Sequence, residues 1–154
     1  MYKRQGGSRP ARPGVTAHLG GHGGTVSEQT LTATGPVDPA EAWERFMRPE
    51  RWPEWSPQIT GVESSAPRLA AGVTGTVRAP LGIGLPFVVD EVDEAARRWT
   101  WQVRSGPVHL RLEHWVEATA DGGTTTGLRV SGPGLLVTSY APLAEVALQK
   151  LVRG

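Results

Sequence analysis

The sequence predicts a single α+β domain in which a curved antiparallel sheet of seven strands wraps around a long C-terminal helix, with two short helices after the first strand. Three observations support this fold class. The chain of 154 residues has the size of one domain with one core. Six of the strand-like segments follow one another through short connections, as antiparallel neighbours do. The one long stretch with helical periodicity lies at the C-terminal end, over about 135–152.

The first strand is expected at 28–34, where the run E-Q-T-L-T-A-T is rich in threonine and is closed by a Gly-Pro pair. Asp38 then precedes a proline, the pattern of an N-cap followed by proline at the first helical position. A helix is therefore expected over 39–47. The prolines that follow permit at most one more helical turn, around Trp52 and Trp55.

Period-two alternation then marks six further strands. They cover residues 59–64, 72–79, 87–92, 98–104, 108–118 and 124–131. The glycine-rich stretch 81–86 is expected to be a mobile hairpin tip at a cavity entrance. An acidic group at 90–94 is expected to be a solvated turn, since its spacing matches no calcium loop. In the last helix, Pro142 is expected to cause a kink or to mark the true start.

The sheet and the last helix are expected to enclose a cavity. That helix is the one large element available to cover the apolar face of the sheet. The side chains on this face are too few to fill the volume between helix and sheet, so a ligand cavity is expected, of a size that the sequence does not determine.

The domain is expected to occupy 25–154, after a disordered extension over 1–24. The extension is rich in glycine and has no apolar periodicity, so it buries too little surface to order itself. It also holds four of the 16 basic residues of the chain and no acidic one. A basic arm for nucleic acid is the alternative, but the composition favours disorder, and no nucleic-acid partner is expected. Residues 1–5 resemble the translation of a sequencing adapter.

Composition and motifs exclude several classes of protein. The chain has no cysteine, which excludes disulfides, thiolate metal sites and a cysteine nucleophile. It contains no nucleophile elbow, P-loop or dinucleotide fingerprint, so neither a cofactor nor a metal is expected. No stretch approaches ~18 uninterrupted apolar residues, and no secretory signal is evident, so a cytoplasmic protein without stable membrane insertion is expected.

Five segments occur in an order that resembles one superfamily. They are D-P-A-E-A-W-E-R-F (38–46), W-P-E-W-S-P-Q-I-T-G-V-E (52–63), G-V-T-G-T-V-R (72–78), F-V-V-D-E-V-D-E-A-A-R-R-W-T-W (87–101) and H-W-V-E-A-T-A-D-G-G-T (114–124). Together they resemble the START-like, helix-grip proteins (SRPBCC), and within these the polyketide cyclase/dehydrase and lipid-transport family.

The resemblance implies a helix-grip fold that binds a small hydrophobic or aromatic molecule, such as a lipid, quinone or polyketide, beneath the C-terminal helix. It also implies two alternatives: an enzyme of the polyketide cyclase or dehydrase type, and a protein-interaction module like the co-chaperone members. It supplies no list of catalytic residues, because cavity residues differ widely between members. The oligomeric state and the choice between carrier and enzyme stay open.

Alternation along 108–118 places one ionisable side chain, that of His114, on an otherwise apolar inner face. His114 is therefore the candidate acid or base for a ligand carbonyl or enol. The alternative is a neutral, hydrogen-bonded structural histidine. The candidate ligand-binding residues are those expected on the inner faces of the strands and helices: Trp55, Phe87, Trp99, Trp101, Leu112, His114, Leu128, Val130 and Tyr140.

Overall fold

The structure, a computed structural model, describes residues 26–153, so the expected extension over 1–24 lies outside the described residues. Its elements are, in chain order, β1 (Val26–Gly35), α1 (Pro39–Met47), the 3-10 turn Pro49–Arg51, α2 (Trp52–Trp55), β2 (Gly61–Ser64), β3 (Thr74–Ala79), the 3-10 turn Pro80–Gly82, β4 (Ile83–Asp93), β5 (Arg98–Ser105), β6 (Val108–Ala118), β7 (Thr124–Pro133) and α3 (Gly134–Arg153). All neighbouring strands are antiparallel, in the order β1-β7-β6-β5-β4-β3-β2. The predicted fold class is confirmed.

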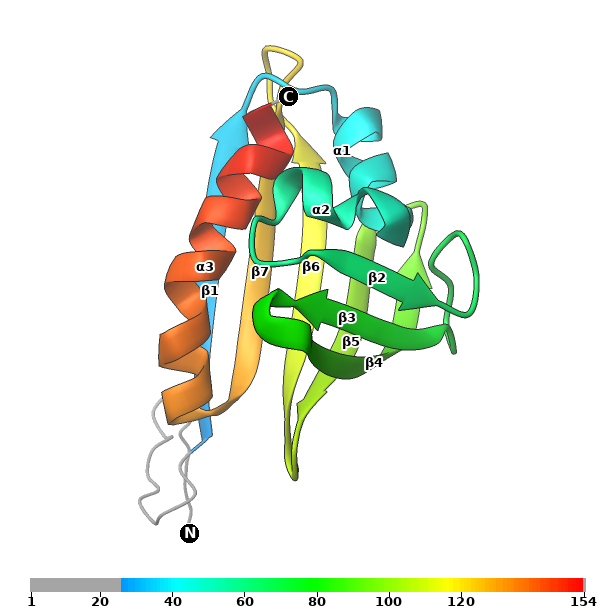
Figure 1. The fold of residues 1–154 in the computed structure, drawn as a ribbon. Helices are drawn as coiled ribbons and strands as arrows, with labels where there is room; N and C mark the ends of the chain where they lie inside the picture. The colour runs from blue at the N-terminus through cyan, green and yellow to red at the C-terminus, as the bar shows by residue number, and fades with distance from the viewer. Residues whose placement is uncertain (1–25, 154) are drawn as a thin grey trace, which may run out of the picture.

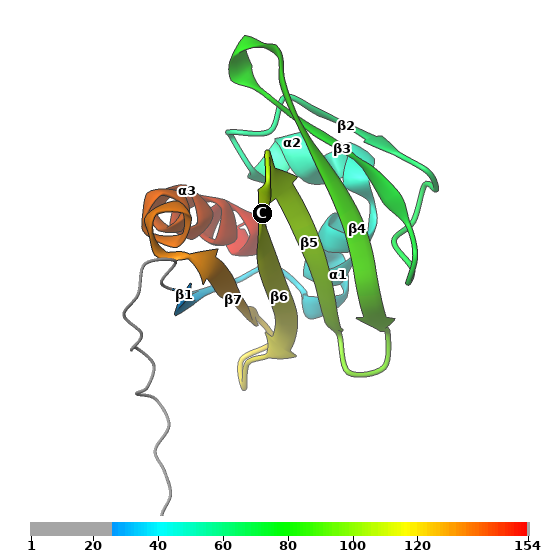
Figure 2. The same cartoon turned by 90° about the horizontal axis from the view of Figure 1, so that it is seen from below.

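The helices share the inner side of the curved sheet (Figures 1 and 2). The long helix α3 lies along β1 and β7, whereas α1 and α2 lie inside the curve that β2 to β6 form. The sequence indicated the last helix as the one large element that covers the sheet. The short helices α1 and α2 share this role, because they bury Phe46, Met47 and Trp52 against the inner face.

The predicted helices are present with nearly the predicted bounds. Helix α1 begins where expected because the Asp38 side chain accepts a hydrogen bond from the backbone N–H of Ala40 at 2.9 Å. Helix α3 begins at Gly134 and continues through Pro142, which therefore does not mark its start. Its buried residues include Ala144, Ala147 and Leu148.

The glycine-rich stretch 81–86 is mostly strand, contrary to the expected mobile tip. The tip itself is Pro80–Gly82, where Leu81 has a positive φ of 67° and is 97% exposed. From Ile83 onward the chain pairs with β3. Pro86 is tolerated there because pairing of β4 with β5 begins one residue later, at Phe87, so Pro86 has a neighbour on one side only.

Gly75 in β3 is a position where a side chain has no room. A Cβ atom there would lie 2.0 Å from the backbone oxygen of Glu63 and 2.8 Å from the Phe87 ring. We expect Gly75→Ala to lower the free energy of unfolding by about 1–3 kcal/mol, since the backbone of β2 would have to shift. Urea denaturation followed by tryptophan fluorescence measures this. Gly61→Ala is the matched control, because nothing lies within 4 Å of its Cβ position; similar losses in the two variants would contradict the prediction.

Candidate ligand-binding site

The centre of the core is a stack of aromatic rings on the inner faces of β5 and β6. Trp99 and Trp101 project from β5, and Trp99 pairs in register with His114 of β6. The imidazole stacks on the Trp99 indole, with 4.7 Å between centroids and 14° between planes. Trp99 in turn stacks on Trp101 at 5.2 Å. Alternation along two adjacent strands therefore brings these three predicted site residues together.

Rings from α1 and α2 fill most of the space beside this stack. Phe46 of α1 lies 4.8 Å from the His114 ring and 5.4 Å from Trp55, and Trp52 of α2 lies 5.1 Å from Trp101. The remaining cavity measures about 30 Å³. Pockets that hold drug-sized ligands measure roughly 300–1,000 Å³. The expectation that the side chains are too few to fill this space is therefore wrong: the volume that remains is about that of one water molecule.

The cavity lies between α2, α3 and strands β5 to β7. Its lining consists of Trp52, Trp55, Ser56, Ile59, Trp99, Trp101, His114, Leu128, Tyr140, Ala144, Ala147 and Leu148. Six of the nine candidates from the sequence are among these residues. The other three are buried elsewhere: Phe87 packs between Trp52 and Trp101, while Leu112 and Val130 face each other across β6 and β7.

Sequence reasoning missed half of the lining. The residues that it left out are Trp52, Ser56, Ile59, Ala144, Ala147 and Leu148. Those on α3 follow Tyr140 at helical spacing, and this periodicity was a usable signal. The three from 52–59 lie in a proline-rich segment without periodicity, so no local pattern indicates which way they point.

The cavity wall contains polar atoms without a protein partner. Within residues 26–153, the indole nitrogens of Trp99 and Trp101 and both ring nitrogens of His114 are buried and accept or donate no hydrogen bond. His114 therefore lacks the protein partner that the structural alternative expected. Such groups are rare in protein interiors, because each loses its hydrogen bonds to water without replacement.

The other buried indoles have hydrogen-bond partners. The indole nitrogen of Trp43 donates to Glu94 at 2.8 Å, that of Trp52 to the Phe46 carbonyl at 2.9 Å, and that of Trp55 to the Arg45 carbonyl at 3.2 Å. All three residues lie on the helices α1 and α2. Trp52 and Trp55 donate to backbone carbonyls of α1, and Trp43 donates to a carboxylate that follows β4. The unpaired indole nitrogens are thus confined to β5, at the cavity.

Both titratable groups of the cavity are neutral near pH 7. Burial lowers the pKa of His114 to about 3, because the imidazolium cation would lose its hydration. Burial also raises the pKa of Tyr140 to about 12, because the phenolate anion would lose its hydration. The cavity therefore offers hydrogen-bonding groups without a formal charge.

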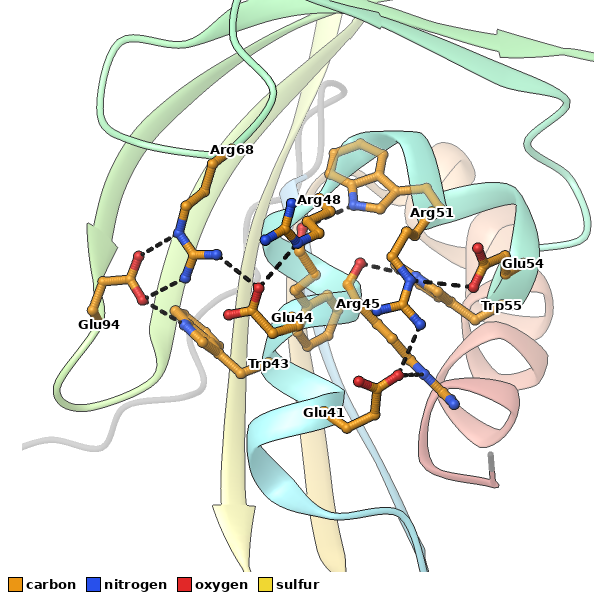
Figure 3. A network of polar contacts seen from close by, with 12 residues as sticks. Glu41, Trp43, Glu44, Arg45, Arg48, Arg51, Glu54, Trp55, Arg68 and Glu94 are labelled. Carbon is orange, nitrogen blue, oxygen red and sulfur yellow. Dashed lines mark hydrogen bonds and ion pairs between the residues drawn. The ribbon is translucent and has the colours of Figure 1, made fainter.

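An ion-pair network fixes α1 to the sheet (Figure 3). Arg68 donates to Glu44 at 2.8 Å and to Glu94 at 2.9 Å, and Trp43 donates to the same Glu94 carboxylate. The hydrogen bonds from Arg68 lower the pKa of both carboxyl groups. The acidic group at 90–94 is therefore not a simple solvated turn: it continues β4 as far as Asp93, and Glu94 anchors α1.

Comparison with known proteins places this geometry in a family. Residues 10–154 match the family model described as polyketide cyclase / dehydrase and lipid transport. The chain belongs to this family. No curated protein was found to match it.

Solved structures show that this family member has the helix-grip fold. The crystal structure of Ara h 8.0201 is similar with a TM-score of 0.59 and 18% identity, and the match covers 79% of this chain and 95% of that one. The structure of XoxI from Bacillus cereus is similar with a TM-score of 0.66 and 14% identity, covering 82% and 93%. The predicted resemblance is confirmed. Family and fold are consistent with binding of a hydrophobic ligand.

Residues 26–153 of this family member contain no group of three His, Asp or Glu side chains that could hold a metal ion. Helix α3 is long and apolar enough to cross a membrane by length and composition alone. It packs Val137, Leu148 and Leu151 into the core, as the central helix of a folded domain does.

Proposed function

We propose that this member of the polyketide cyclase/dehydrase and lipid transport family binds a small aromatic molecule that carries a hydrogen-bond acceptor. The observation behind this proposal is the pair of unpaired indole N–H groups of Trp99 and Trp101 beside the unpaired imidazole of His114. A ligand carbonyl would accept from one of these donors, and its ring would stack on the aromatic wall. The pairing would offset a desolvation cost that the closed protein leaves uncompensated.

Binding requires the cavity to expand, since about 30 Å³ holds no aromatic molecule. We place this expansion at the seam between α2 and α3. The α3 side of this seam presents the small side chains of Ala144 and Ala147, so separation of the two helices exposes little apolar surface there. The ion pairs of α1 hold the other side of the site in place.

The low pKa of His114 favours carriage over catalysis. A group with a pKa of about 3 is a weak base and is almost entirely unprotonated near pH 7, so it is poorly matched to acid–base work there. The polyketide cyclase or dehydrase alternative, with His114 as acid or base, therefore needs a bound ligand that raises this pKa. Turnover that His114→Leu abolishes while ligand affinity stays within a few-fold would support that alternative.

A pair of isosteric probes tests the proposed function. Acetophenone carries a carbonyl where isopropylbenzene carries a methyl group. By calorimetric titration we expect the ketone to bind the wild-type protein more tightly than the hydrocarbon. Trp101→Phe removes one N–H donor and is expected to weaken ketone binding by about 2–10-fold, the net value of one neutral hydrogen bond, with hydrocarbon binding unchanged.

Trp43→Phe is the matched control for this experiment. Its indole N–H donates to Glu94, away from the cavity, so ketone affinity should not change. Binding of neither probe, or equal weakening of both by Trp101→Phe, would contradict the proposal. Native mass spectrometry of the freshly purified protein would identify a molecule that it carries.

A further inference from the structure

A second hollow opens at the C-terminal end of α3, directly outside the cavity. This outer cleft measures about 310 Å³ and is lined by Arg45, Glu54, Trp55, Lys150 and Arg153. Trp55 lines both the cleft and the inner cavity. Its indole is therefore the partition between a solvent-filled cleft and the buried aromatic site.

Trp55 is a buried residue, 7% exposed, that belongs to the hydrophobic core. It is the last residue of the one-turn helix α2. Its indole N–H donates to the Arg45 carbonyl at 3.2 Å (Figure 3). Its ring packs edge-on against Phe46. On the cleft side lie the charged side chains of Lys150 and Arg153, which belong to the last turn of α3. A passage between cleft and cavity therefore requires the Trp55 indole to leave the Arg45 carbonyl and the Phe46 ring.

The outer cleft has an excess of positive charge. Among residues 26–153, the one carboxylate that lines it is that of Glu54, which already pairs with Arg51 at 3.3 Å. The Arg45 guanidinium pairs with Glu41 at 3.3 Å and donates to the Leu151 carbonyl at 2.7 Å. Lys150 and Arg153 are exposed, and neither forms an ion pair with a carboxylate of residues 26–153. These two cations are available to an anion in the cleft.

The inner cavity, by contrast, excludes an ionised group. His114 and Tyr140 are both neutral there, and the rest of the lining is apolar or aromatic apart from the Ser56 hydroxyl. An ion in such surroundings would lose its hydration without an opposite charge. A ligand that carries a charge must therefore leave that charge in the outer cleft.

From this arrangement we infer that the outer cleft is the mouth of the site and that the ligand is an aromatic carboxylate. Its ring passes Trp55 into the cavity, and its carboxylate stays outside between Lys150 and Arg153. This inference rests on the proposed function, since it names the class of molecule that the same cavity takes. The alternative role of the two cations is purely structural: they would complement the negative C-terminal end of the α3 dipole. The experiment distinguishes this role from carboxylate binding.

The test compares 4-oxo-4-phenylbutanoate with its uncharged primary amide by calorimetric titration at low salt. Two exposed ion pairs predict that the wild-type protein binds the acid about five-fold more tightly than the amide. The double variant Lys150→Gln/Arg153→Gln is expected to bind acid and amide equally, with amide affinity unchanged. The matched control is Arg104→Gln/Arg111→Gln, which removes the same charge from the outer face of β5 and β6 and should keep the preference for the acid.

Each outcome decides a separate point. Equal binding of acid and amide by the wild-type protein overturns the inference and leaves the proposed function intact. A preference for the acid that survives in the Lys150→Gln/Arg153→Gln variant also overturns it, because the cleft cations then hold no carboxylate. Binding of neither compound overturns the proposed function and the inference with it. Weakening of both compounds by Trp101→Phe is the further expected result, since one molecule spans cavity and cleft.

Discussion

Replacing His114 with leucine is expected to stabilise the free protein by about 1–3 kcal/mol at pH 7. The imidazole is buried, and neither of its nitrogens has a hydrogen-bond partner among residues 26–153, so unfolding restores its hydrogen bonds to water. Leucine has a similar volume and loses no such bonds on burial. Urea denaturation measures the difference. His109→Leu, on the exposed outer face of β6, is the matched control and should change the free energy of unfolding by less than about 0.5 kcal/mol.

The same substitution is expected to remove a pH dependence. The pKa of His114 is about 3 in the folded protein and near 6.5 in the unfolded chain, so the unfolded chain takes up a proton first. The free energy of unfolding is therefore highest above pH 6.5. It decreases as the pH falls toward 3, by up to about 1.4 kcal/mol per pH unit. Carboxyl groups whose pKa is lowered, such as Glu44 and Glu94, contribute to the loss of stability mainly below about pH 4.5, the ordinary pKa of a glutamate.

The interval from pH 6.5 to 4.5 therefore reports on His114. Urea denaturation at pH 7.0, 6.0 and 5.0 should show a loss of stability in the wild-type protein that His114→Leu lacks. An equal slope in the two proteins would show that His114 is solvated or hydrogen-bonded in solution, and it would remove the main support for a desolvated site.

Phe46→Ala is expected to cause the largest loss of stability, about 3–5 kcal/mol. Phe46 is 0% exposed and contacts Trp55, Trp99 and His114, so its ring joins α1, α2 and the sheet. Truncation leaves a cavity that neighbouring rings cannot fill without leaving their own contacts. Urea denaturation at pH 7 provides the measurement.

Phe46→Leu is the control for this prediction, since it keeps most of the apolar volume and should lose less than half as much. A loss below about 1 kcal/mol for Phe46→Ala would mean that α1 repacks freely. Helix α1 would then be able to move, and expansion of the cavity for a ligand would involve α1 as well as the seam between α2 and α3.

Sequence alone determined the order and type of the elements, because these depend on local patterns. The Asp38 cap and the proline after it set the start of α1. Period-two alternation placed Trp99, Trp101 and His114 on the inner faces of β5 and β6, since a strand reverses its side chains at every residue. These three residues are the part of the candidate site that could be predicted with a physical reason.

Only the tertiary structure decided how full the cavity is and where it opens. The ring of Trp52 closes it from a segment whose prolines leave no periodicity to interpret, and the ring of Phe46 closes it from α1. The outer cleft brings Arg45 beside Lys150, 105 positions later in the chain. Alternation predicts which side of a strand a residue faces. The volume left between the sheet and the helices depends on every side chain that enters this space, and only the folded chain determines which side chains those are.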